Sequence, residues 1–450
     1  METATARGRG VAAHRPPQRV TVVGAGMVGL ATAWFLQERG VEVTILDRTG
    51  VAAGSSWGNA GWLTPGITTP LPEPAVLSYG IRAVLSPSSP VYVPPSANPS
   101  LLRFLLGFAR HSTAAAWQRA MAALVPINRI ALASFDELTA GGVAAPTHEA
   151  KSFTAAYRTE AERRVLLEEI EQIHAAGQPM SYDVLTGDQA RAIEPALSEE
   201  IGAALVLHDQ RYVNPGQFVQ ALADSVVDRG GHLMAPAEVT GVDDLGAKVE
   251  VTTTEHGVIT SDAVVLATGA WLGTLARRFG VRKIVQAGRG YSFSVPVKDL
   301  PHGPVYFPAA RVACTPLTGD QVGSSPASAG SRGVVPPSGL GDRLRVAGMM
   351  EFRRPEAPLD ERRIAAIVDA ARPLLRGADL DHRSEEWVGS RPCTADGLPL
   401  VGVTRSPHVY VAGGHGMWGI TLGPATGQSL AEQIVTGRAP EAVRAFDPLR

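Results

Sequence analysis

The sequence predicts an α/β protein in which a parallel sheet carries glycine-rich turns. The first observation behind this prediction is a strand, a helix and a second strand in direct succession. A buried run lies at Val20 to Val23, a helical pattern begins near Met27 and stops at Gly40, and a second strand follows at Val41 to Leu46. A strand–helix–strand unit places its two strands parallel, because an antiparallel pair would need only a short hairpin.

The second observation is that two later buried runs, Ala263 to Ala267 and Val409 to Ala412, also run into glycines. Between these strands the hydrophobic periodicity predicts the other elements in turn. They are an extended loop at 50–99, helices at 101–138, 160–176, 188–193 and 217–229, a series of strands over 232–271, strands at 283–295 and 343–350, and helices at 360–375 and 424–435. Residues 319–342 have the composition of a flexible loop, and residues 1–17 that of a disordered tail.

Composition excludes several classes of protein. The 450 residues carry 41 Lys and Arg against 43 Asp and Glu, a net charge of −2, which gives no basic excess for binding nucleic acid. The two cysteines, Cys314 and Cys393, are far apart and fit neither a disulfide framework nor a zinc site, so we expect no metal and a reducing, cytoplasmic location. No apolar run is long enough to span a membrane. The 48 glycines and 34 prolines indicate either disorder or many tight backbone approaches to a ligand.

The first glycine turn has the pattern of a dinucleotide site. Gly24, Gly26 and Gly29 form G-x-G-x-x-G between strand and helix, where they permit a tight turn, a close approach of pyrophosphate and close packing of helix on strand. The helix N-terminus then faces the phosphates. An acid at the end of the second strand can accept hydrogen bonds from ribose hydroxyls, and it disfavours NADP while leaving NAD and FAD open. The expected binding residues here are Gly24, Ala25, Gly26, Met27, Val28, Gly29, Asp47 and Arg48.

The later turns can serve the same ligand. Ala267, Thr268 and Gly269 follow the second buried strand. The last strand runs into Gly414, His415, Gly416, Met417, Trp418, Gly419, Ile420 and Thr421, and helix N–H groups at this point could stabilise negative charge. His415 could act as a general base, although a histidine held beside the backbone for structural reasons is the more frequent case.

Five segments of the chain have the form of known motifs. They are VVGAGMVGLATAWFLQERGVEVTILDR at the first turn, SSWGNAGWLTPG from Ser55, GRGYSFSV from Gly288, WVGSRPCTADGLPLVG from Trp387 and GGHGMWGITLGPATGQ from Gly413. These segments resemble the FAD-dependent D-amino acid dehydrogenase family, within the superfamily of glycine oxidase, sarcosine oxidase and D-amino acid oxidase. Together they extend over nearly the whole chain.

The resemblance implies a Rossmann-type FAD-binding domain of the glutathione-reductase-like kind, interleaved with an α+β substrate domain built on a mixed or antiparallel sheet. We expect residues 18–90, 195–275 and 385–450 in the first domain, and 91–194 and 276–384 in the second. The flavin ring is expected near Asn59, Ala60 and Gly61 and near Gly416 to Thr421, with Ser55 and Ser56 at the start of the same flavin loop. The adenine is expected near Val239. Residues 54–61 contain no His or Cys, and Cys393 does not align with the attachment cysteine of covalent relatives, so we expect non-covalent FAD.

The resemblance also implies the chemistry. Arg391 would grip the substrate carboxylate through a bidentate pair that lysine cannot copy, with Tyr291 and Tyr306 as further candidates. Hydride would pass from Cα of a D-amino acid or similar small amine acid to flavin N5, and the imine would hydrolyse to a 2-oxo acid and ammonia, with no catalytic base. The alternatives are an oxygen-using oxidase of glycine, sarcosine or a cyclic imino acid, and a non-catalytic flavin-binding subunit of a larger complex.

The electron acceptor is left open between oxygen, a quinone and a carrier protein. Family dehydrogenases often work as peripheral proteins at the inner face of the membrane, but the sequence shows no clear amphipathic anchor. Residues 318–340 are inserted relative to the usual dehydrogenase, and Ser390 replaces a usual leucine beside Arg391. These departures leave the particular substrate open.

Overall fold

A six-stranded sheet carries the three glycine turns at one edge. The computed structural model describes residues 15–74, 86, 89–318 and 342–450. Its strand order is β10 (His232–Met234), β2 (Glu42–Leu46), β1 (Arg19–Val23), β14 (Ala263–Leu266), β21 (Val409–Gly413) and β20 (Leu400–Val403). The first five strands are parallel and β20 is antiparallel to β21. β14 is wholly buried, as expected of a parallel strand covered on both faces.

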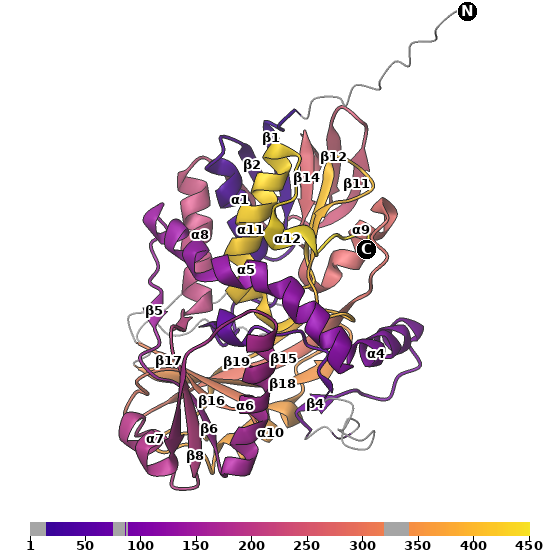
Figure 1. The fold of residues 1–450 in the computed structure, drawn as a ribbon. Coiled ribbons are helices and arrows are strands. Elements are labelled where there is room, and N and C mark those ends of the chain that lie inside the picture. The colour runs from indigo at the N-terminus through magenta and orange to yellow at the C-terminus, as the bar shows by residue number, and fades with distance from the viewer. Residues whose placement is uncertain (1–14, 75–85, 87–88, 319–341) are drawn as a thin grey trace, which may run out of the picture.

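Helices cover one face of this sheet and a smaller sheet covers the other (Figure 1). The helices are α1 (Met27–Gln37), α8 (Pro215–Asp228) and α11 (Gly419–Thr436), and the final short helix is α12 (Glu441–Arg444). The smaller, antiparallel sheet comprises β11 (Val239–Asp244), β12 (Val249–Thr253) and β13 (Gly257–Ser261), next to α9 (Leu272–Ala276). α1 is apolar on nearly all sides because it packs between the sheet and its neighbouring helices.

A nine-stranded sheet forms the second half of the molecule, below the first in Figure 1. Its order is β19 (Ser384–Thr394), β15 (Val285–Pro296), β18 (Arg343–Phe352), β17 (Val312–Leu317), β16 (Val305–Phe307), β6 (Phe153–Tyr157), β8 (Ala203–Leu207) and β7 (Tyr182–Thr186), and β4 (Val91–Tyr92) pairs with β18. Helix α10 (Glu361–Ala371) packs on one face, and α6 (Glu160–Ala175) packs near β6 and β8. The remaining elements are α7 (Gly187–Ile193) and a small sheet of β3 (Trp62–Leu63), β9 (Arg211–Tyr212) and β5 (His148–Glu149).

The single helix expected at 101–138 is two helices, α4 (Pro99–His111) and α5 (Ala114–Ala140). The break has a local cause. Thr113 is extended, and its side chain accepts a hydrogen bond from the Ala116 amide as the N-cap of α5. Ser112 turns its hydroxyl back to the Phe108 carbonyl, which it reaches at 2.9 Å. The apolar residues continue through this point, so periodicity alone conceals the break.

The sheets do not follow the expected domain boundaries at every point. β8 lies after residue 195 and nearly all of β19 lies after residue 385, yet both belong to the nine-stranded sheet. Helix α5 lies within 91–194, yet it packs its apolar side against α11 in the core of the six-stranded sheet. By strand pairing the chain leaves the nine-stranded sheet after β8 at Leu207 and after β19 at Thr394, and the division into two domains stays a prediction. The expected tail at 1–17 and the loop at 319–342 lie almost wholly outside the described residues.

Candidate active site

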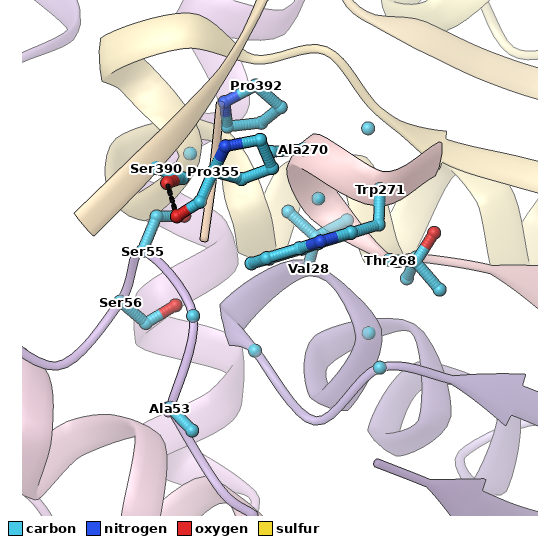
Figure 2. A pocket seen from close by; sticks show the side chains of 18 of the residues that line it. Val28, Ala53, Ser55, Ser56, Thr268, Ala270, Trp271, Pro355, Ser390 and Pro392 are labelled. Carbon is cyan, nitrogen blue, oxygen red and sulfur yellow. Dashed lines mark hydrogen bonds between the residues drawn. The ribbon is translucent and has the colours of Figure 1, made fainter. Parts of the chain in front are cut away.

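A cleft opens at the carboxyl ends of β1, β14 and β21 and extends under the nine-stranded sheet. Figure 2 shows part of it, with Val28, Thr268 and Trp271 on one side and Ser390, Pro355 and Pro392 on the other. Crevices at this edge of an open α/β sheet are the usual ligand sites of such folds. Residues from both sheets line it, so a bound ligand would lie between the two domains.

The first glycine turn is shaped for close approach. Gly24 has φ +117°, and a Cβ at this position would lie 2.4 Å from the Ala267 carbonyl oxygen, so only glycine fits. α1 then begins at Met27, with Gly26 as its N-cap residue, no side-chain cap and no acid in its first turn. The N-terminal N–H groups of an uncapped helix attract anions such as phosphate. Gly24, Gly26, Met27, Val28 and Gly29 line the cleft, while Ala25 is buried behind it.

Asp47 lines the cleft at the end of β2, and its carboxylate also ties the turns together. One oxygen accepts from the Ala25 amide at 2.8 Å, and the other accepts from the amides of Thr49 and Gly50 at 2.8 and 2.9 Å. A carboxylate has about four acceptor sites, so capacity is left for a ribose hydroxyl. The ribose contact of Asp47 stays a prediction. Arg48 and Val239 line the same part of the cleft.

The second turn contains an unsatisfied polar group. Thr268 lines the cleft together with Ala267 and Gly269, and its hydroxyl oxygen is buried without a hydrogen-bond partner among the residues that the structure describes. A buried hydroxyl without a partner is costly, so such groups usually meet a ligand or water. The residues present therefore fit an extended phosphate-containing cofactor: a helix end without a cap, an unpartnered hydroxyl and a backbone turn that no side chain fills.

The third turn places His415 in the cleft wall. It is 4% exposed, and its Nε2 shares a 2.9 Å hydrogen bond with the Thr426 hydroxyl. Burial lowers the pKa of His415 to about 4, so the ring is neutral near pH 7. A neutral ring whose Nε2 is engaged by Thr426 is a weak candidate for proton removal. Gly416, Met417, Gly419 and Ile420 also line the cleft, while Gly414 lies behind it.

Trp418 and Thr421 hold a neighbouring loop instead of lining the cleft. The Trp418 indole donates to the Thr69 carbonyl at 2.7 Å, and the Thr421 hydroxyl donates to the Trp62 carbonyl at 2.8 Å. Both bonds fix the chain that follows the expected flavin loop.

The loop at 53–61 joins the two domains. Ser55, Ser56 and Asn59 line the cleft, and the Ser56 hydroxyl accepts from the Met27 amide at 3.3 Å. Ala60 and Gly61 lie behind these residues. The Ala60 carbonyl accepts from the Thr315 hydroxyl of the nine-stranded sheet at 2.7 Å, and the Gly61 carbonyl accepts from the Val213 amide at 2.8 Å.

Arg391 is a cation in the part of the cleft wall that the nine-stranded sheet forms. It lies on β19, is half-buried, and forms no ion pair with any described residue. One guanidinium nitrogen donates to the Met349 carbonyl at 2.9 Å. Burial lowers the pKa of Arg391, because a positive charge without a partner is disfavoured away from water. A carboxylate bound in the cleft would supply the missing partner.

The two candidate tyrosines lie outside the cleft lining. Tyr291 points into the core under α10, where its hydroxyl donates to the buried carboxylate of Glu351. Tyr306 packs against Trp62 with 5.2 Å between ring centroids. Burial raises the pKa of Tyr306. Their resemblance-based role in binding a carboxylate therefore gains no support from the geometry.

The structure also brings residues to the cleft that the sequence reasoning left out. The indole of Trp271 donates to Glu356, its ring lies 4.3 Å from the Arg48 guanidinium, and the Ser390 hydroxyl donates to the Pro355 carbonyl at 3.2 Å. Trp271 and Ser390 stand inside motifs already singled out, so the sequence held a signal for them. The residues missed are Val23, Leu46, Thr49, Ala53, Gly54, Ala237, Glu238, Ala270, Trp271, Thr274, Leu275, Pro355, Glu356, Ala357, Val388, Ser390, Pro392, Ala412 and Gly413.

Three strand-to-glycine turns and a cleft shared with a second sheet define a dinucleotide-dependent enzyme. Within the described residues, no group of three or more His, Cys, Asp or Glu side chains could hold a metal ion. The chain belongs to the FAD-dependent oxidoreductase family, whose model matches residues 19–433. FAD is therefore the cofactor, and its binding at the glycine turns stays a prediction.

Known proteins with similar sequences and folds agree with this family. D-amino acid dehydrogenase of Cereibacter sphaeroides is 29% identical over 430 residues, which cover 94% of this chain and 93% of that protein. The enzyme of the same name from Bradyrhizobium diazoefficiens is 28% identical over 431 residues, covering 94% and 96%. Glycine oxidase from Geobacillus kaustophilus has a similar fold, with a TM-score of 0.69, 22% identity and coverage of 96% and 99%.

Proposed function

We propose that this protein catalyses the oxidative deamination of a small amine acid, with D-amino acids as the leading substrates. The family supplies FAD and oxidoreductase chemistry. The similarity to D-amino acid dehydrogenases over 94% of the chain favours the D-amino acid. An electron acceptor must complete the cycle.

One observation carries the proposal: Arg391 is a half-buried cation in the cleft wall without an ionic partner among the described residues. A guanidinium in this state favours a ligand carboxylate, which it can bind through two parallel hydrogen bonds. One guanidinium nitrogen of Arg391 donates to the Met349 carbonyl. This hydrogen bond restrains the tilt of the planar guanidinium. The substrate carboxylate would thereby fix the position of Cα.

The chemistry needs positioning more than proton transfer. FAD, when bound, supplies the acceptor for a hydride from Cα. Loss of that hydride from a neutral amine leaves an iminium, which loses a proton to give the imine. The imine adds water, and the hydrated imine then loses ammonia to give the 2-oxo acid. His415 is neutral and hydrogen-bonded to Thr426, so we give it a structural role in the cleft wall.

An anaerobic substrate panel tests this function. The purified protein is mixed with D-amino acids, their L-enantiomers, glycine, sarcosine and proline, and bleaching of the yellow flavin is followed, with ammonia measured at the end. We expect bleaching by D-amino acids with stoichiometric ammonia. Bleaching by glycine, sarcosine or cyclic imino acids alone would favour the oxidase alternative. A yellow protein that no amine acid bleaches would favour a non-catalytic flavin subunit.

We further propose that FAD is held without a covalent bond. Both Cys314 and Cys393 are buried free thiols, and neither lines the cleft. Acid precipitation should release all of the flavin into the supernatant. Yellow colour retained on the precipitated protein would contradict this proposal.

For the acceptor, we propose a quinone reached at an anionic lipid surface through helix α4. None of the described helices is long and apolar enough to cross a bilayer. On α4, Phe104 and Phe108 pack into the protein, while Leu102 and Leu106 are 51% and 68% exposed. Arg103 and Arg110 are exposed as well. Leucines beside arginines on one outward helix face suit a negatively charged membrane surface.

Co-sedimentation with lipid vesicles tests the α4 surface. We expect binding to phosphatidylglycerol vesicles, weaker binding to phosphatidylcholine vesicles, and loss of binding in the double variant Leu102→Glu and Leu106→Glu. Val165→Glu, at another exposed apolar position, is the matched control. Equal binding by the double variant and the control would contradict the assignment.

The acceptor itself is tested by reoxidation of the reduced flavin. Rapid reoxidation by oxygen in place of a quinone would favour an oxidase.

A further inference from the structure

The sheet under Arg391 contains an irregularity with an unusual geometry. β15 and β18 are antiparallel, with Arg289 opposite Glu351 and Tyr291 opposite Gly348. Met349 and Met350 on β18 therefore lie opposite the single residue Gly290 on β15, which is a β-bulge. Met349 has φ +66°, a left-handed conformation that a side chain disfavours. Such outliers persist where the surrounding structure holds them, often at functional sites.

The bulge turns the Met349 carbonyl toward Arg391. In the sheet order β19, β15, β18, Arg391 and Met349 lie on strands that are not neighbours. Their hydrogen bond of 2.9 Å therefore requires the arginine side chain to cross over β15. The crossing occurs at Gly290, where an added Cβ would lie 2.2 Å from the guanidinium carbon and 2.2 Å from one of its terminal nitrogens.

Other glycines of this sheet have different obstacles. A Cβ on Gly288 would meet the sulfur atoms of Met350 and Cys393, and one on Gly389 would meet the ring of Trp387. Only at Gly290, among these three, is the obstacle the charged group in the cleft wall. The absence of a side chain at Gly290 therefore leaves room for the Arg391 guanidinium. The Met349 carbonyl, on the next strand, accepts a hydrogen bond from that guanidinium.

We propose that Gly290 and the left-handed Met349 form a positioning device that sets the tilt of the Arg391 guanidinium and thereby the binding of the substrate α-carboxylate. The inference rests on the proposed function, in which Arg391 binds that carboxylate. Gly290 and Met349 are positioning residues, since they act through Arg391.

A double-mutant cycle tests the device. Gly290→Ala is made in the natural chain and in the Arg391→Ala background, and the dissociation constant of the best amine acid is taken from anaerobic flavin bleaching. We expect Gly290→Ala to weaken binding at least tenfold in the natural chain, with a smaller change in the limiting bleaching rate, and to have little effect once Arg391 is absent. Gly241→Ala is the matched control, because a Cβ there meets no atom closer than 3.7 Å.

A second pair of variants tests Met349. Glycine accepts φ +66° freely and isoleucine strongly disfavours it, so Met349→Ile should weaken binding more than Met349→Gly. Equal losses in the two variants would contradict a role for the left-handed backbone. Equal effects of Gly290→Ala with and without Arg391 would overturn the device, since the glycine would then act by another route.

Thermal unfolding keeps the test independent of the proposed function. Gly290→Ala should lower Tm in the natural chain and lower it less in the Arg391→Ala background, where the group it collides with has been removed. If no amine acid bleaches the flavin but this pattern of Tm holds, the proposed function has failed. The contact between Gly290 and the Arg391 guanidinium is then still supported. If the losses of Tm are equal in both backgrounds, the positioning device itself is refuted.

Discussion

Replacing Arg391 should separate carboxylate binding from every other task of the protein. One guanidinium nitrogen is engaged by the Met349 carbonyl, and the remaining donors have no charged partner among the described residues. A bidentate pair with a substrate carboxylate would comprise two charge-assisted hydrogen bonds of about 1.5–3 kcal/mol each. Arg391→Ala should therefore lower kcat/KM by roughly 10²–10⁴, at about 1.4 kcal/mol for each factor of ten. Arg391→Lys keeps one bond and should lose roughly 10–10².

The assay compares an amine acid with the amine that lacks its carboxylate, by stopped-flow bleaching without oxygen. The loss should appear with the amine acid and be nearly absent with the amine. Both variants should keep a full complement of FAD, because the glycine turns and not Arg391 are expected to hold the cofactor. An equal loss with both substrates would refute the reasoning, as would an unchanged KM for the amine acid.

Three further predictions concern the cofactor turns and pH. Gly24→Ala should yield protein without flavin, because the added Cβ would collide with the Ala267 carbonyl; flavin content after purification is the measurement. Thr268→Val should weaken FAD binding about tenfold, the value of one hydrogen bond, without lowering Tm of the FAD-free protein, since the hydroxyl has no partner there; titration of that form with FAD shows whether this holds. Burial lowers the pKa of His415 to about 4 from 6.5, so the unfolded chain takes up a proton before the folded one as pH falls. The stability that neutral His415 contributes is complete above about pH 6.5 and declines by about 3 kcal/mol toward pH 4, a slope that His415→Gln should flatten in urea titrations.

The glycine turns could be predicted from the sequence because each is formed by residues that follow one another in the chain. A buried strand that ends in Gly24 or Gly269 needs no distant partner to be recognised. These turns explain part of the abundance of glycine. Another part is explained by glycines such as Gly290, where a side chain would collide with a residue of a neighbouring strand. The sequence predicts a ribose contact for Asp47, and the structure adds that its carboxylate holds the turn beside it.

The rest of the site depends on pairing between distant strands. Tyr291 stands one residue from Gly290, yet the pleat of β15 directs its side chain to the opposite core, where Glu351 binds it. No local pattern marks Pro355 to Ala357 as cleft residues, because they follow β18 and reach the cleft only through the fold of the second sheet. The same limit applies to Met349, whose left-handed backbone follows from a bulge that only the sheet register reveals.

The most direct measurement is the anaerobic reaction of the flavin-loaded protein with a D-amino acid and with its decarboxylated amine, each tested in the natural chain and in Arg391→Ala. We predict rapid bleaching with release of ammonia and 2-oxo acid for the natural chain and the amino acid, with a loss of roughly 10²–10⁴ in the variant for that substrate alone. A flavin that no amine acid bleaches, or bleaching by the amino acid that is unchanged without Arg391, would contradict the account.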